Sequence, residues 1–126
     1  MADADSDPFF DIAGWQAMFE GEADSPPDGC IGIIRRADFT AHHGSLLVWR
    51  GGRTVIVDYA GSSDVAVLLV ADEESMLQLR ARGFAALPPL IRQGRLHPYI
   101  LKTLDQLEDA GMMDFIEDLG LVFPKH

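Results

Sequence analysis

Two adjacent glycines between two strand-forming segments constrain the fold of this chain more than any other feature. Residues 46–59 read LLVWRGGRTVIVDY, with Gly51-Gly52 at the centre. Glycine adopts positive φ without steric cost, and a two-residue type I′ turn requires positive φ at both central positions. The sequence therefore predicts a tight antiparallel hairpin between residues 46–50 and 53–59.

The two-residue turn also fixes the register of this hairpin, so that Arg50 faces Arg53 and Trp49 faces Thr54. One face then carries Leu46, Val48, Val55 and Val57, and the other carries Leu47, Trp49, Thr54 and Ile56. Because both faces are apolar, each must be covered. Two hypotheses remain for the face of Leu47, Trp49 and Ile56: an N-terminal helix covers it, or it binds a partner or a second subunit.

At the tip of the hairpin, Arg50 and Arg53 place like charges directly across a strand pair. Such a pair costs roughly 0.2–1 kcal/mol unless an anion lies nearby. The tip is either solvated or an anchor for acidic groups. Whether Arg35 and Arg36 lie near it depends on the strand order.

The remaining patterns predict one α+β domain across residues 1–126, with residues 1–7 disordered. It comprises an N-terminal helix, a four-stranded antiparallel β-meander, and three to four C-terminal helices packed on the sheet. Short connections favour antiparallel pairing, and strands followed by helices are typical of α+β folds. The expected strands are 30–36, 46–50, 53–59 and 65–70, and the expected helices are 8–20, 73–82, 88–94, 97–110 and 112–119.

Charge is segregated along the chain, whose net charge is −10. Residues 1–28 hold eight acidic residues and no base, whereas residues 29–102 hold six acidic residues and nine bases. Residues 103–126 hold six acidic residues and one base. This layout argues against direct binding to nucleic acid, because phosphates would be repelled by the acidic ends.

The acidic residues near the C-terminus are expected on the polar sides of two helices. They are Asp105, Glu108, Asp109, Asp114, Glu117 and Asp118. Such a surface is either a solvated helix face or a docking surface for a basic protein, such as a toxin, an effector or a nucleic-acid-binding protein. Complementary charge of this kind raises association rates and selects partners.

Few residues are candidates for chemistry. Asp38, His42 and His43 suggest a metal site only weakly, because adjacent histidines on an extended segment point opposite ways. Cys30 is either a buried small hydrophobe or a nucleophile, and the first fits an apolar strand better. No nucleotide-binding, hydrolase or metal-binding motif occurs, so we expect no cofactor, no metal and no catalytic residue.

Other features favour a cytoplasmic protein without membrane contact. The single cysteine excludes an internal disulfide framework, and the N-terminus has no basic segment of a secretion signal. The longest apolar run, residues 65–71, is far shorter than the roughly 20 residues that span a bilayer.

Together these patterns predict a non-enzymatic acidic protein-binding module. Its most concrete form is an inhibitor or immunity-type protein that neutralises a basic partner. One alternative is a homodimeric secretion chaperone or adaptor that uses the hairpin face. Another is a small enzyme or metal-binding protein that uses Cys30, His42 and His43.

Overall fold

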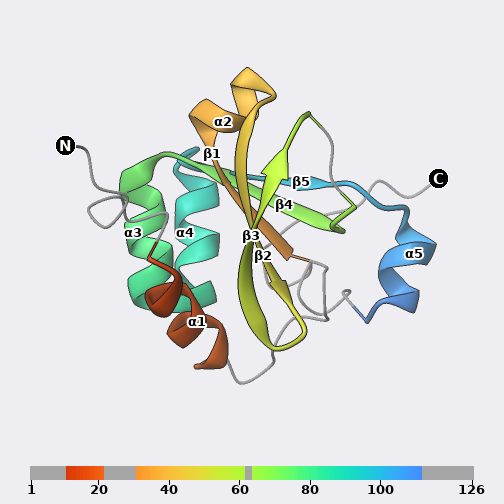
Figure 1. The fold of residues 1–126 in the computed structure, drawn as a ribbon, viewed down its shortest axis with the longest axis horizontal. Helices are drawn as coiled ribbons and strands as arrows, with labels where there is room; N and C mark the ends of the chain where they lie inside the picture. The colour runs from red at the N-terminus through yellow and green to blue at the C-terminus, as the bar shows by residue number, and fades with distance from the viewer. Residues whose placement is uncertain (1–10, 22–30, 62–63, 112–126) are drawn as a thin grey trace.

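The computed structural model describes residues 11–21, 31–61 and 64–111 (Figure 1). Its strands are β1 (Ile31–Arg35), β2 (Gly44–Arg50), β3 (Arg53–Tyr59), β4 (Val67–Ala71) and β5 (Leu96–Ile100). Its helices are α1 (Ile12–Glu20), α2 (Arg36–Ala41), α3 (Glu73–Arg82), α4 (Leu87–Arg92) and α5 (Leu104–Asp109), with a 3-10 helix η3 (Gly83–Ala86) before α4. The strands form one mixed sheet in the order β3-β2-β1-β4-β5.

The β2–β3 hairpin has the predicted register. Arg50 faces Arg53, and Trp49 faces Thr54. Gly51 and Gly52 have φ of 63° and 73°, which is the sign that a type I′ turn requires.

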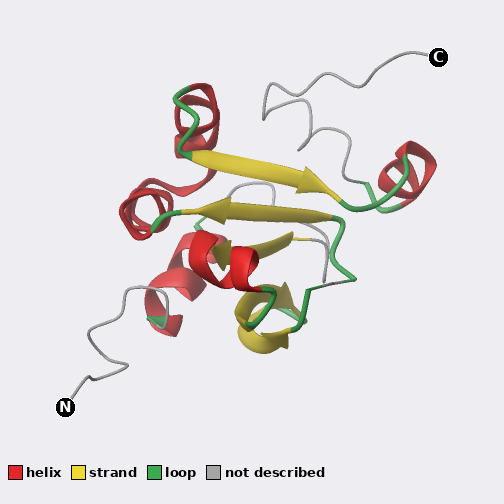
Figure 2. Cartoon of the chain, turned by 90° about the horizontal axis from the view of Figure 1, so that it is seen from above, coloured by secondary structure: helices red, strands yellow, loops and turns green. Residues whose placement is uncertain are grey.

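The predicted antiparallel meander is wrong, although the mixture of helices and strands is confirmed. β4 does not pair with β3 but lies beside β1 and parallel to it (Figure 2). In this pair Ile33 faces Leu69. The hairpin occupies one edge of β1, and β4, whose five residues are all buried, occupies the other. A fully apolar strand is typical of an interior position beside a parallel neighbour. This burial outweighs the preference of short connections for a meander.

A fifth strand replaces the first part of a predicted helix. Residues 96–100, expected to open a helix at His97-Pro98, pair with β4 as an antiparallel edge strand. The Leu101 N–H donates to the Ala66 carbonyl at 2.8 Å. By alternation along the ladder, the Pro98 nitrogen therefore faces the open edge, where no hydrogen bond is lost. The helix begins only at Leu104, because Thr103 caps it.

Helices cover the two faces of the sheet unequally. α1, α3, α4 and α5 contribute to a core on the face of Ile31, Ile33 and Leu69. The opposite face is built on Ile34, Leu68 and Val70 with the apolar residues of the hairpin, and α2 packs against it through Phe39. In the view of Figure 1, α1, α3 and α4 lie together at the left end of the molecule and α5 lies at the right end.

The remaining helices agree with prediction in part. α3 begins after the Asp72 cap and ends at Gly83 as expected, and α4 lies in the region of the predicted short helix. α1 begins at Ile12 in the described structure, capped by Asp11, and α2 occupies a segment expected to be a connection. None of the described helices combines the length and apolarity that crossing a membrane requires. The predictions for residues 1–7, Cys30 and residues 112–119 lie outside the described residues.

Candidate functional site

The acidic part of the candidate site lies on α5. Thr103 accepts from the Gln106 N–H at 3.2 Å, and the Gln106 side chain accepts from the Thr103 N–H at 2.9 Å. This reciprocal pair is a capping box, which fixes the start of the helix. Leu107 is fully buried beneath the helix. The outward positions carry Asp105, Glu108 and Asp109, all exposed.

No base lies on α5 itself. Across residues 11–21, 31–61 and 64–111 there are eleven acidic residues and nine bases, so this body is only slightly acidic. Most of the excess of acidic residues belongs to segments that the structure does not describe, including Asp114, Glu117 and Asp118. Within the described body, α5 is a place where exposed carboxylates gather without a base on the same element.

The apolar face of Leu47 and Trp49 is covered by α1. Phe19 stacks on Trp49 with ring centroids 4.9 Å apart and an interplanar angle of 23°. Leu47 is fully buried and Trp49 is 8% exposed, while Ile56 is half-buried. Of the two hypotheses for this face, the one with the N-terminal helix is confirmed. Leu47 and Trp49 are core residues in this arrangement and offer little surface to a partner.

The tip of the hairpin is exposed and is held from one side. Gln16 on α1 accepts from the Thr54 N–H at 2.7 Å and donates to the Gly52 carbonyl at 2.9 Å. Arg50 Nη2 lies 3.6 Å from Asp64 Oδ1, and Arg53 is exposed. Both arginines therefore remain accessible to an acidic group of a partner.

The second arginine pair is remote from this tip. Ile33 faces Leu47 across the antiparallel β1–β2 pair, which places Arg35 level with the start of β2 rather than with its end. Along the direction of the strands, Arg35 and Arg36 therefore lie at the opposite end of the sheet from Arg50 and Arg53.

The candidate metal residues do not form a site. Asp38 accepts from Arg35 at 3.3 Å and from the Ser45 N–H at 3.4 Å, so its carboxylate joins α2 to both flanking strands. His42 ends α2 in the left-handed conformation with φ of 56°, and both His42 and His43 are exposed. Within the described ranges, no three metal-ligating side chains come together.

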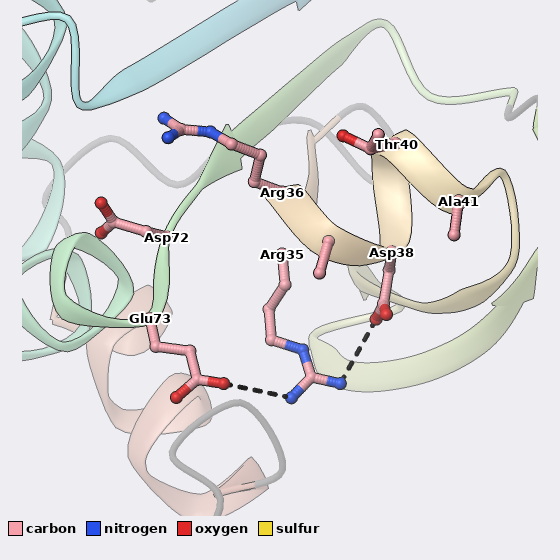
Figure 3. Close-up of a pocket in the computed structure, with 8 residues that line it drawn as sticks. Arg35, Arg36, Asp38, Thr40, Ala41, Asp72 and Glu73 are labelled. Carbon is pink, nitrogen blue, oxygen red and sulfur yellow. Dashed lines mark hydrogen bonds and ion pairs between the residues drawn. The ribbon is translucent and has the colours of Figure 1, made fainter.

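A pocket that the sequence did not predict lies where β1 and β4 end. Because the two strands are parallel, their carboxyl ends meet at one edge of the sheet. The pocket has a volume of about 740 Å³ and is lined by Arg35, Arg36, Ala37, Asp38, Thr40, Ala41, Asp72 and Glu73 (Figure 3). The all-apolar sequence of β4 was the available signal, because it is typical of strands with parallel neighbours.

Ion pairs organise the walls of this pocket. Arg35 lies between Asp38, at 3.3 Å, and Glu73, at 3.8 Å. Arg36 points the other way in Figure 3 and donates to the Arg95 carbonyl at 3.1 Å. Asp72 accepts from the Ser75 N–H at 2.8 Å. That hydrogen bond holds the pKa of the Asp72 carboxyl below its usual range, and the charges of Arg95 and Arg36 act in the same direction.

Comparison with known proteins does not connect this chain with a family. No protein-family model matches the chain, and no curated protein matches it.

Proposed function

We propose that this protein is a non-enzymatic, cytoplasmic, acidic module that binds a basic partner protein. Its most concrete form is an inhibitor or immunity-type protein that neutralises a toxin, an effector or a nucleic-acid-binding protein. The observation that carries the proposal is α5, on which Asp105, Glu108 and Asp109 are exposed without a base.

The anchoring of α5 supports this role. Leu107 is buried and the capping box fixes the first turn, so the carboxylates project from a positioned helix. Positioned carboxylates lose less conformational entropy on binding than mobile ones. Charges of one sign also speed the encounter with a partner of the opposite sign. Asp114, Glu117 and Asp118 follow in the sequence and add to the negative charge of this end of the chain.

The hairpin tip is a secondary candidate contact, since Arg50 and Arg53 are accessible to carboxylates of the partner. The alternative of a homodimer through Leu47, Trp49 and Ile56 has less support, because α1 already covers the first two residues.

The proposal is tested by affinity capture from the native cell at low salt. The acidic variant carries Asp105→Asn, Glu108→Gln and Asp109→Asn. A matched control carries Glu20→Gln, Asp58→Asn and Glu74→Gln, which removes the same charge from exposed positions on α1, β3 and α3. We expect wild type and control to retain one basic partner and the α5 variant to lose it. Equal capture by all three proteins, or capture of no basic protein by the wild type, would overturn the proposal.

A further inference from the structure

The pocket at the ends of β1 and β4 lies at a topological switch point. After β1 the chain enters α2, which packs on one face of the sheet through Phe39. After β4 it enters α3, which packs on the other face through Met76 and Leu79. When the connections of two adjacent parallel strands diverge to opposite faces, they leave a crevice at the carboxyl ends, where α/β proteins bind ligands.

The charges of the lining residues select the class of ligand. Three carboxylates and two guanidinium groups line the pocket. Arg35 is already matched by two of the carboxylates, and Arg36 extends away to the Arg95 carbonyl. Asp72 accepts from the Ser75 N–H at Oδ1 and is half-buried, so part of its carboxylate faces solvent. Glu73 is 67% exposed and its contact with Arg35 is long. Acceptor atoms are therefore available.

An anion fits this pocket less well than a cation. The N-terminus of α3 favours negative charge, but Asp72, Glu73 and Glu74 already supply three carboxylates there. An added anion would meet their repulsion. The opposite wall contains Ala37 and Ala41 of α2, which suit an aliphatic chain. The walls together match a cationic head on an apolar stem.

We propose that this pocket binds an organic cation of the guanidinium or alkylammonium type, with Asp72 and Glu73 holding the charged head and Ala37 and Ala41 contacting the stem. The cation is either a free small molecule or the side chain of an arginine or lysine in a peptide. Because β5 runs antiparallel to β4, α5, which follows β5, lies at the opposite end of the sheet from this pocket. Binding of a cation in the pocket is therefore independent of α5.

The test is an amide chemical-shift titration with probes of matched shape. Agmatine represents a free cation, and N-acetyl-arginine amide represents a peptide side chain. N-acetyl-citrulline amide keeps the shape without the charge, and glutarate supplies the opposite charge. We expect both cations to shift the amides of Ala37, Ala41 and Glu73, with Kd on the order of 1 mM. The tighter of the two identifies the source of the ligand, and the neutral and anionic probes should leave these amides unchanged.

Two variants connect the binding to the named carboxylates. Asp72→Asn with Glu73→Gln retains a side chain that caps α3 and should weaken binding about tenfold, or roughly threefold for each carboxylate removed. Glu74→Gln is the matched control, because Glu74 lies in the same turn and does not line the pocket. Equal binding of the arginine and citrulline probes, preference for glutarate, no shift with any probe, or equal weakening by Glu74→Gln would each overturn the proposal.

Discussion

Gly44 is a single residue on which the junction between α2 and β2 depends. Its φ is 154°, and a Cβ built there would lie 2.4 Å from Asp38 Cγ and 2.7 Å from Asp38 Cβ. Asp38 cannot move away easily, because it bonds both Arg35 and the Ser45 N–H. We expect Gly44→Ala to lower the free energy of unfolding by at least about 2 kcal/mol, from strain and overpacking together.

Gly94→Ala is the control for this substitution. Gly94 also has positive φ, 72°, but nothing lies within 4 Å of the position that a Cβ would occupy there. Its substitution should cost only the backbone term of about 1–2 kcal/mol. Urea denaturation measures the free energy of unfolding of both variants. A loss for Gly44→Ala no greater than that for Gly94→Ala would contradict the close contact with Asp38.

Asp72 gives a prediction for the pH dependence of stability. Its folded-state pKa is lowered, chiefly by the Ser75 N–H, so its carboxylate form stabilises the folded state. This contribution is present above the unfolded pKa of about 3.9 and is lost as the pH falls through the lower folded pKa. Asp72→Ala should cost about 1 kcal/mol near neutral pH, a typical value for an N-cap.

The difference in the free energy of unfolding between wild type and Asp72→Ala should become smaller in acid. Urea denaturation at several pH values measures this difference. Asp58→Ala serves as the comparison, because Asp58 is exposed on β3. A difference for Asp72→Ala that is independent of pH would show that the charge of this residue does not stabilise α3.

Among the elements, α1 is joined to the sheet by one polar side chain as well as by its apolar face. Gln16 satisfies the Thr54 N–H and the Gly52 carbonyl at the outer edge of β3. Gln16→Ala removes both hydrogen bonds and should cost about 1–3 kcal/mol. The Thr54 amide should lose protection against hydrogen exchange. Gln93→Ala, at an exposed position after α4, is the control and should leave that amide unchanged.

Some features of the helices and strands are determined by local sequence, and others are not. The hairpin register follows from Gly51-Gly52, and the start of α3 follows from Asp72, because both depend on residues adjacent in the chain. The apolar sequence of β4 is typical of a strand with a parallel neighbour, but no local pattern specifies that this neighbour is β1. The pocket between Arg35 and Glu73 escapes prediction for the same reason, since only the parallel pairing brings these residues together.

The sequence predicts a helix where β5 lies, because proline, here Pro98, is common at helix starts as well as on edge strands. Residues 96–100 alternate between buried or half-buried and exposed positions, which is the strand period. Asp105, Glu108 and Asp109 are exposed, as expected for the polar side of a helix, and their role in binding stays a prediction. The sequence leaves open whether the N-terminal helix or another molecule covers Trp49, because tertiary packing decides between the two.

At the scale of the whole molecule, the proposed function rests on where charge is concentrated rather than on its total. The described body holds nine of the ten bases and only eleven of the twenty acidic residues. A general attraction between an acidic protein and any basic protein would depend on total charge. Recognition by α5 depends on three positions, and matched variants separate the two cases.

The most direct measurement is the salt dependence of Kd for the captured partner, determined by calorimetry with wild type, the α5 variant and the matched control. We predict that affinity falls as salt rises for wild type and control, with the same slope. The α5 variant should bind more weakly at low salt and show a shallower slope. Identical slopes and affinities for the three proteins would contradict recognition through Asp105, Glu108 and Asp109.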